Sequence, residues 1–372
     1  MENRQVVLIK QSDYSSDSLL CSIRKAIELT SFDLTRVGGA TVLLKPNLVT
    51  AHRPEEAVTT HPAFVAAVGR VFREAGAEVW VGDCPMGDIS FEDVLTATGV
   101  GAACREAGLI LRDFRTAGVV SRQGFPLSKV IADADFVINL PKFKTHLFTM
   151  MTLSVKNLFG CVESNKRADY HRISPRLFSF SETLVKIAEV IAPDLNLVDG
   201  IVAMDGYGPT LGDPFPLSAI VASKNIHASD WAACTLIGLN PLHLETLRAA
   251  VRLGVWNYSD SVRLTGDPIE SMRSIDFTVP YEIDRSWFFQ FAKQWWHNRL
   301  SPQPQIDRQQ CKRCGLCFRS CPAGAIVLNK ENFPRLLNRR CIKCYCCTEV
   351  CPHHAVLLNE GLLRRVAAWF SH

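Results

Sequence analysis

The chain has 372 residues, a formal net charge of +4, 47% hydrophobic residues and 21% charged residues. This composition is typical of a soluble globular protein, and the length predicts two or three domains because one hydrophobic core rarely organises so many residues. No run of about eighteen apolar residues occurs, so we expect no transmembrane span. The start of the chain is unlike a signal peptide, so we expect a cytoplasmic protein.

Predicted strands and helices alternate over the first two thirds of the chain. Short apolar runs predict strands at residues 6–10, 41–44, 77–81, 109–113, 136–140, 195–198 and 219–222. Apolar residues at helical spacing predict helices at residues 18–29, 61–75, 91–97, 102–107, 146–160, 174–191, 229–237 and 242–253. Strands separated by helices favour βαβ units, so we expect residues 1–280 to form a mainly parallel-sheet α/β domain.

The segments that flank the C-terminal part are rich in aromatic and basic residues. Residues 281–304 are predicted to form an aromatic helix and a proline linker, and residues 361–372 an amphipathic tail. Tryptophan and arginine beside a large apolar face are typical of interfacial helices, so peripheral membrane contact is one interpretation. The interpretation we favour is that the aromatic helix docks a small C-terminal domain, residues 305–360, onto the α/β domain.

Nine of the 14 cysteines lie between residues 311 and 351. Eight of them form two runs with the spacing C-x2-C-x2-C-x3-C-P, namely Cys311, Cys314, Cys317 and Cys321, then Cys341, Cys344, Cys347 and Cys351. In two-cluster ferredoxins the fourth cysteine of each run ligates the other cluster. The sequence therefore predicts two [4Fe-4S] clusters in a bacterial-type ferredoxin domain. One set is Cys311, Cys314, Cys317 and Cys351, and the other is Cys341, Cys344, Cys347 and Cys321.

Other interpretations of these cysteines fit less well. Zinc sites usually pair two short cysteine hairpins or add histidines, and structural disulfides are disfavoured in reducing compartments. Cys346 has no ligand role in the scheme. Residues 301–360 carry nine basic and four acidic side chains. We favour local compensation of anionic clusters as the reason, with a docking patch for an acidic redox partner as the alternative. No basic stripe in a recognisable module indicates nucleic-acid binding.

Polar residues directly follow several predicted strands. Lys45 and Asn47 follow the second strand, Asp83 ends the third, and Asp199 and Asp205 lie in a glycine-rich stretch after a later one. Ligands of parallel sheets bind beyond the carboxyl ends of the strands, so these residues are candidates for substrate binding. For Asp199 and Asp205 the turn signal Asp-Gly is the stronger interpretation.

The segment after the strand at 136–140 is the most informative. Lys142, Lys144 and His146 alternate along it, so an extended backbone would point all three to one side. Together with Lys45 they suit an anionic ligand, and we predict catalytic roles for all four. Lys156 and Asn157 are further binding candidates. The alternative is that the lysines are solvated side chains after a strand.

Two other features have milder interpretations. Residues 206–212 contain three glycines, but their spacing is not that of a dinucleotide-binding loop, and we interpret them as a mobile loop over the crevice. Four histidines are isolated and are interpreted as packing or surface residues, namely His52, His61, His171 and His227.

Several motifs in the same order resemble one family. They are Lys45-Pro-Asn47, Gly82-Asp83, and the stretches at 139–146, 152–160 and 199–209. Together they resemble the uncharacterised iron-sulfur-centre proteins known as domain of unknown function 362, many of which carry a C-terminal ferredoxin module. The resemblance implies a redox protein with two [4Fe-4S] clusters whose larger domain has no assigned substrate.

Three functions fit these observations. The first is an electron-transferring oxidoreductase whose clusters pass single electrons from a ferredoxin-like donor to an anionic small molecule. The second is an electron carrier or adaptor whose α/β domain docks a partner redox protein. The third is non-redox chemistry in the α/β domain, with clusters that stabilise or sense.

Overall fold

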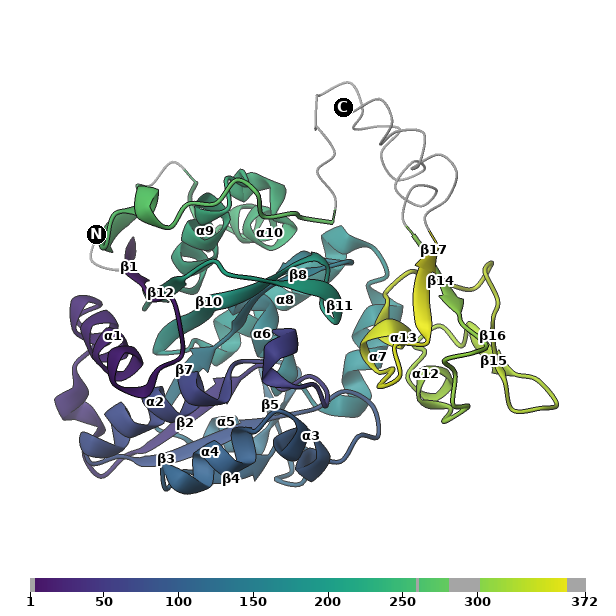
Figure 1. Ribbon diagram of the computed structural model, residues 1–372, viewed down its shortest axis with the longest axis horizontal. Coiled ribbons are helices and arrows are strands. Elements are labelled where there is room, and N and C mark those ends of the chain that lie inside the picture. Colours follow the sequence, from purple (N-terminus) through teal and green to yellow (C-terminus); the bar gives the residue numbers. More distant parts are fainter. Residues whose placement is uncertain (1–3, 259–260, 281–301, 360–372) are drawn as a thin grey trace. The chain divides into compact units, whose positions relative to one another are not determined.

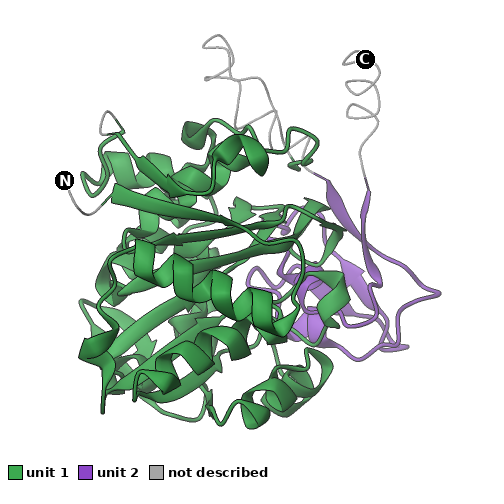
Figure 2. Ribbon diagram, turned by 60° about the vertical axis from the view of Figure 1, so that its left-hand side comes forward, with its two compact units in different colours: residues 1–280 green, residues 281–372 purple. Residues whose placement is uncertain are grey.

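The computed structural model describes residues 4–258, 261–280 and 302–359, and the chain divides into two compact units, residues 1–280 and 281–372 (Figure 2). The aromatic segment 281–301 and the tail 361–372, for which we predict helices, lie outside the described residues. Within the described part, none of the helices is long and apolar enough to cross a membrane.

Unit 1 contains one large sheet and one separate hairpin. The eleven strands of the large sheet are β1 (Gln5–Lys10), β2 (Thr41–Pro46), β3 (Glu78–Asp83), β4 (Ile110–Asp113), β7 (Phe136–Leu140), β8 (Lys142–His146), β9 (Met150–Thr152), β10 (Leu195–Tyr207), β11 (Leu211–Phe215), β12 (Ala219–Ser223) and β13 (Arg263–Gly266). The hairpin consists of β5 (Val119–Arg122) and β6 (Phe125–Ser128).

Helices connect most of these strands (Figure 1). They are α1 (Ser16–Leu29), α2 (Pro62–Glu74), α3 (Phe91–Ala97), α4 (Val100–Glu106), α5 (Lys129–Asp133), α6 (Ser154–Asn157), α7 (Ser164–Ile173), α8 (Leu177–Ile191), α9 (Ile226–Leu236) and α10 (Glu245–Arg252). Shorter 3-10 turns are η2 (Leu34–Val37), η3 (Pro54–Glu56), η4 (Leu158–Cys161), η5 (Pro241–His243) and η6 (Ile269–Ser271).

Most neighbouring strands of the large sheet are parallel. The order is β13-β1-β12-β10-β7-β2-β3-β4, with β8 and β11 paired to β10, and β9 paired to β8. The pairs β1–β13, β2–β3, β2–β7, β3–β4, β7–β10 and β8–β10 are parallel. β12 runs antiparallel to both β1 and β10. The mainly parallel α/β body predicted from the alternation of strands and helices is confirmed.

Helices cover both faces of the sheet. Successive side chains of a strand point to opposite faces, and the residues of one face, including Val7, Val42 and Ile138, pack with α1, α2 and α4 in one hydrophobic core. The other face is covered by α6 and α9, and α8 packs beside α6. There the Nδ2 of Asn139 in β7 donates to the carbonyl oxygen of Ser154 in α6 at 3.0 Å.

The carboxyl ends of β2 and β7 mark a topological switch point. From β2 the chain continues to β3 and β4 on one side, and from β7 it continues to β10 and β12 on the other. Ligands of open α/β sheets bind at such a point. Thr60 joins the two strand ends, because its Oγ1 accepts from the backbone N–H of Asn47 at 2.8 Å and donates to the carbonyl oxygen of Leu140 at 2.7 Å.

Two local predictions are wrong. The helix expected at residues 146–160 is instead β9, α6 and η4, because the Nδ1 of His146 accepts the backbone N–H of Phe148 and turns the chain after β8. Asp199 and Asp205, expected in turns, both lie in β10, which pairs first with β12 and then with β11. Residues 206–212, interpreted as a loop over the crevice, therefore belong to the β10–β11 hairpin.

Unit 2 is a small domain with two short two-stranded sheets. Its elements are β14 (Gln303–Ile306), α12 (Leu316–Arg319), β15 (Ile326–Leu328), β16 (Pro334–Leu336), α13 (Cys346–Glu349) and β17 (Val356–Asn359). β14 pairs with β17 and β15 with β16, both antiparallel. This is the ferredoxin-like domain that the cysteine spacing predicts.

The bridge formed by Thr60 gives a first testable prediction. Thr60→Val keeps the shape of the side chain but leaves a buried N–H and a buried C=O without a partner, which we expect to lower the free energy of unfolding by about 2 kcal/mol. The exposed Thr116, whose Oγ1 donates to the carbonyl oxygen of Asp113, is the control, and Thr116→Val should cost less than about 0.5 kcal/mol. Urea unfolding followed by circular dichroism measures both, and equal costs would contradict the prediction.

Candidate functional site

Two groups of four cysteines line two cavities in unit 2. One cavity is lined by Cys311, Cys314, Cys317 and Cys351. The other is lined by Cys321, Cys341, Cys344 and Cys347. Each group takes three cysteines from one run and the fourth from the other run, as the spacing predicts for two-cluster ferredoxins. Four cysteine side chains around one cavity are the donor set of a [4Fe-4S] cluster, so the residues present fit two such clusters.

The two cysteines that cross between the runs each receive a backbone hydrogen bond. The N–H of Ala325 donates to the Sγ of Cys321 at 3.2 Å, and the N–H of Ala355 donates to the Sγ of Cys351 at 3.3 Å. Hydrogen bonds to cluster-ligating sulfurs contribute to setting a cluster's reduction potential. The sequence indicated the ligands but could not indicate these bonds.

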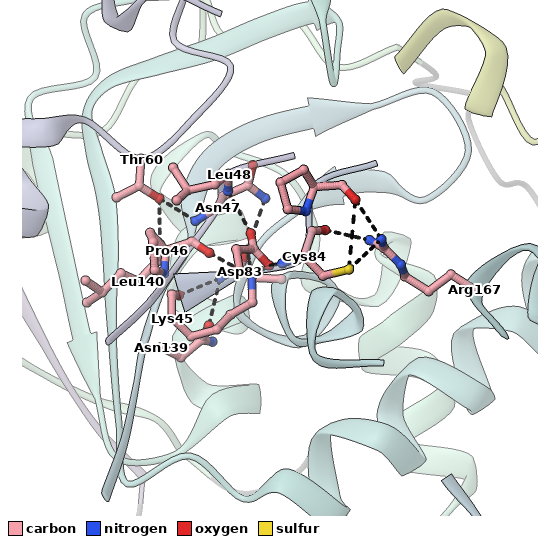
Figure 3. Close-up of polar contacts among 12 residues, drawn as sticks. Lys45, Pro46, Asn47, Leu48, Thr60, Asp83, Cys84, Asn139, Leu140 and Arg167 are labelled. Atoms are coloured by element: carbon pink, nitrogen blue, oxygen red, sulfur yellow. Dashed lines mark hydrogen bonds and ion pairs between the residues drawn. The ribbon is translucent and has the colours of Figure 1, made fainter. Parts of the chain in front are cut away.

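A buried ion pair lies at the carboxyl ends of β2 and β3 (Figure 3). The Nζ of Lys45 is 2.8 Å from the Oδ1 of Asp83, and neither side chain is more than 4% exposed. Asp83 also accepts the backbone N–H groups of Leu48 at 2.7 Å and Cys84 at 2.8 Å. These bonds offset the cost of desolvating two charges. Gly160 packs so closely on the pair that a Cβ there would lie 2.4 Å from the Asp83 Oδ1.

A row of buried polar residues crosses the face of the sheet that α6 covers. Lys45 of β2, Asn139 of β7, Asn196 of β10 and Ser223 of β12 occupy adjacent register positions, and none is more than 1% exposed. The Nδ2 of Asn139 donates to the Oδ1 of Asn196 at 2.9 Å, and the Nδ2 of Asn196 donates to the carbonyl oxygen of Ser223 at 3.2 Å. These hydrogen bonds link three of the strands, β7, β10 and β12.

Asn157 of α6 extends this row to the loop after β2. Its Nδ2 donates to the carbonyl oxygen of Lys45 at 3.1 Å and to the Oδ1 of Asn139 at 2.8 Å, and its Oδ1 accepts from the Nδ2 of Asn47 at 3.0 Å. A backbone carbonyl can only accept, so these contacts assign the orientation of each amide. The far atom of the Asn47 amide is therefore an acceptor oxygen.

This oxygen is the end of the row. Asn47 is only 8% exposed, and within the described ranges its Oδ1 has no hydrogen-bond partner. Buried polar atoms are nearly always hydrogen-bonded, so each exception needs an explanation. The oxygen lies by the topological switch point, where ligands of open α/β sheets bind.

A second buried ion pair lies where β8 runs beside β10. The Nζ of Lys142 is 2.9 Å from the Oδ2 of Asp199, and the two side chains are 1% and 0% exposed. The hydroxyl of Tyr14, in the loop after β1, donates to the Oδ1 of Asp199 at 2.7 Å and accepts from Lys142 at 3.0 Å. The ring of His61 stacks on Tyr14 with centroids 3.5 Å apart, and its backbone N–H donates to Asp199 at 2.9 Å. Tyr14 and His61 are half-buried, so they are more exposed than the two side chains of the ion pair.

The surroundings shift the ionisation of this cluster. Burial lowers the pKa of Lys142, and the neighbouring Asp199 opposes that shift. Burial, reinforced by the charge of Asp199, raises the pKa of Tyr14, so its hydroxyl keeps its proton. Burial lowers the pKa of His61 to about 4, so the ring is neutral near pH 7. Its Nδ1 accepts the N–H of Ala63 at 3.2 Å, which places the ring proton on Nε2.

The backbone of β8 is extended, as the alternation of Lys142, Lys144 and His146 predicts, but these side chains have separate partners. Lys142 pairs with Asp199, whereas the Nζ of Lys144 donates to the carbonyl oxygens of Val58 at 2.6 Å and Pro209 at 3.2 Å. Lys142 and Lys144 are 1% exposed, and His146 is 2% exposed. The prediction that Lys142, Lys144 and His146 face one open crevice together is therefore wrong.

The last two predicted binding residues lie in other surroundings. The Nζ of Lys156 lies 5.4 Å from the centroid of the Phe159 ring, a cation–π contact within its own segment. Asp205 accepts the backbone N–H of Thr278 at 3.1 Å in the part of β10 that pairs with β11. The structure thus brings Lys45, Asn47, Asp83 and Asn157 together, joins Lys142 to Asp199, and leaves Lys156 and Asp205 with other neighbours.

Sequence reasoning missed Tyr14, His61 and Asn196 as members of these clusters, and it also missed the contacts of Cys84. The Nη2 of Arg167 lies 3.1 Å from the Sγ of Cys84 (Figure 3). Tyr14 follows the first strand, so the strand-end rule that selected Lys45 would also have selected Tyr14. No local signal marks His61, which is brought in by the position of α2.

The pKa of His61 predicts a pH dependence of stability. Because folding lowers this pKa from 6.5 to about 4, the unfolded chain binds a proton in that interval that the folded chain does not. The stability that the neutral ring contributes is present above pH 6.5 and is lost as the pH falls through 4. His61→Asn keeps an acceptor at the start of α2 but cannot titrate. Wild type should therefore lose stability more steeply than the variant over this interval in urea unfolding, and parallel curves would contradict the prediction.

Comparisons with known proteins agree with this division of the chain. Residues 42–235 match the model of a domain of unknown function, DUF362, and residues 303–352 match a 4Fe-4S dicluster domain. Thylakoid-associated protein sll1697 from Synechocystis sp. is 37% identical over 258 residues, which are 68% of this chain and 80% of that protein.

Two solved structures are similar at 12% sequence identity. A lactate racemase apoprotein from Thermoanaerobacterium thermosaccharolyticum has a TM-score of 0.40 over 63% of this chain and 58% of that one. A protein from Thermotoga maritima has a TM-score of 0.39 over 62% of this chain and 61% of that one. The match thus spans less than two thirds of either structure. The order of the motifs, the match to residues 42–235 and the identity to the Synechocystis protein together show that this chain belongs to the DUF362 family, with a 4Fe-4S dicluster domain near its C-terminal end.

Proposed function

We propose that this iron-sulfur protein is an electron-transferring oxidoreductase, in which unit 2 exchanges single electrons with a redox partner protein and unit 1 binds an anionic small molecule. The observation that carries the proposal is the crossed grouping of eight cysteines around two cavities. When bound, two [4Fe-4S] clusters would supply one-electron transfer. We also propose a cytoplasmic location.

In the α/β domain we propose the switch point between β2 and β7 as the substrate site. Lys45 lies near the carboxyl end of β2 and Lys142 follows β7, and the ammonium groups of both would attract an anionic group. The Oδ1 of Asn47 would accept a hydrogen bond from a hydroxyl or amide of the same molecule. The half-buried ring of His61 stacks on Tyr14 beside the Lys142 pair, and its Nε2–H would be a neutral donor for the same molecule.

One observation favours a second function. Lys45 and Lys142 are each balanced by a carboxylate 2.8 Å and 2.9 Å away, so neither charge needs a ligand. This arrangement suits an electron carrier or adaptor whose α/β domain is a rigid body that recognises a partner protein. The two functions differ in one measurable respect, because only the first requires a small molecule in unit 1.

The crossed cysteine sets are testable by paired replacement. Replacing Cys321, Cys341, Cys344 and Cys347 together by serine removes one complete set and should leave one [4Fe-4S] cluster. Replacing Cys341, Cys344, Cys347 and Cys351 removes the same number of thiols but breaks both sets, and should leave no cluster with four thiolates. Iron and sulfide content and electron paramagnetic resonance after anaerobic reconstitution measure the outcome. If the second variant retains a cluster as well as the first does, the crossed assignment is wrong.

The substrate site is testable without knowing the substrate. Native mass spectrometry of anaerobically purified wild type should show a retained small anion. The double change Lys142→Met with Asp199→Asn removes both charges together, so it avoids leaving one buried charge alone. We expect at least about a tenfold loss of the retained anion, in proportion to a lost charge contact worth about 1.4 kcal/mol or more.

The matched control is Lys25→Met with Asp267→Asn, an ion pair that is much more exposed. It should leave retention unchanged. If the Lys142 and Asp199 variant retains as much anion as wild type, with its iron content and melting temperature preserved, the proposed substrate site is wrong. In that case the carrier function, which needs no small molecule, would be preferred.

A further inference from the structure

The cluster domain is an internal repeat in backbone as well as in sequence. Corresponding cysteines are 30 residues apart, from Cys311 and Cys341 to Cys321 and Cys351. The two short helices α12 and α13 begin after residues with positive φ, Gly315 at 75° and Tyr345 at 61°. Two equal halves would present two equal surfaces, so a difference between them at equivalent positions points to a role that only one half performs.

The side chains around the first run differ from those around the second. Lys312, Phe318 and Arg319 are exposed, and their equivalents 30 residues later are an isoleucine, a threonine and a glutamate. Cys314 is exposed too, so the first cluster site has a ligand at the surface of unit 2. Phe318 is a large apolar side chain that is 42% exposed.

Charge compensation does not account for this difference. Both sites have four thiolates, so both clusters would carry the same charge and need the same number of nearby cations. Yet residues 308–321 contain four basic side chains and no acidic one, whereas residues 338–351 contain three basic side chains and Glu349. Arg319 is exposed, whereas Glu349 at the equivalent position of the second half is only 6% exposed. The first half therefore presents cations to a negatively charged partner at positions where the second half presents none.

Backbone carbonyl oxygens hold Arg319 at Cys314 and Arg313 at the β15–β16 turn. Nη1 of Arg319 donates to the carbonyl oxygen of Cys314 at 3.3 Å. Nη1 of Arg313 donates to the carbonyl oxygen of Glu331 at 3.2 Å, which leaves that side chain on the same side of the module as the β15–β16 turn. Exposed cations around an exposed aromatic side chain are the composition of a small, transient protein interface.

We propose that the surface formed by Lys312, Arg313, Cys314, Phe318 and Arg319 docks an acidic one-electron carrier protein, and that electrons pass between the carrier and the cluster that Cys314 ligates. The step forms and breaks no bond: the metal centre of the reduced carrier loses one electron and the oxidised cluster gains it. Attraction between the basic surface and the acidic carrier would raise the rate of encounter and would be screened by salt. This inference rests on the proposed electron-transfer function and adds to it the kind of partner and its place of docking.

The test uses the full chain with reconstituted clusters and an acidic [2Fe-2S] ferredoxin as the reduced carrier. The rate of cluster reduction is followed by stopped-flow absorbance as ionic strength is varied. Lys312→Glu with Arg319→Glu should lower the second-order rate constant at low salt by about tenfold or more, and the rates should converge at high salt. The matched control is Arg339→Glu with Arg340→Glu, which makes the same charge change at two exposed positions beside the second run and should change the rate less than about threefold.

Equal slowing by the two double variants, or no slowing by the first, overturns the docking surface. A membrane-binding outcome also overturns it. In that case anionic lipid vesicles would bind wild type but not the Lys312 and Arg319 variant, while the carrier would reduce both proteins at the same rate.

The methyl viologen radical, a small cationic donor, separates this failure from a failure of the proposed function. If it reduces every variant equally, the clusters work and only the docking surface is at issue. If it reduces none of them, wild type included, the electron-transfer function fails and the docking surface fails with it.

Discussion

The α/β domain depends on neutralising lysine side chains that its sheet buries. Moving an ammonium group out of water costs several kcal/mol, and attraction to one carboxylate repays this only if other hydrogen bonds complete the shell. Lys45 and Lys142 meet the condition through Asp83 and Asp199, each held by further donors. The constraint reaches further, because Gly160 has no side chain where one would collide with the Lys45 pair.

The polar row that continues from Lys45 explains why a single region of the sheet holds so many of the motifs. Asn139 and Asn196 sit in neighbouring strands, and Asn157 lies above them in α6. Each amide donates to the next, so the hydrogen bonds run in one direction from Asn47 to the carbonyl oxygen of Ser223. The Oδ1 of Asn47 at the start of the row has no partner among the residues that the structure describes. A network of this kind fixes the strand register and also places a polar atom where the chain changes direction across the sheet.

The cluster domain follows a different principle. Eight of its nine cysteines have the spacing of a known ligand pattern, and its two halves repeat one backbone. What distinguishes the halves is the charge and exposure at equivalent positions, because Arg319 of the first half is exposed and Glu349 of the second half is buried. The cysteine ligands must be the same in both halves because each set binds the same kind of cluster. The surface side chains are not constrained in this way.

Much of this was determined by the sequence alone. The alternation of apolar runs predicts the parallel sheet, and the cysteine spacing predicts both ligand sets, because strand periodicity and ligand spacing are local properties of the chain. Only the tertiary structure decided which polar residues meet. Asp199 lies in a long strand rather than a turn, since β10 pairs with β12 and then β11, and it meets Tyr14 from the loop after β1 and His61 at the start of α2. Contacts between residues so distant in sequence depend on strand order, and no local pattern encodes strand order.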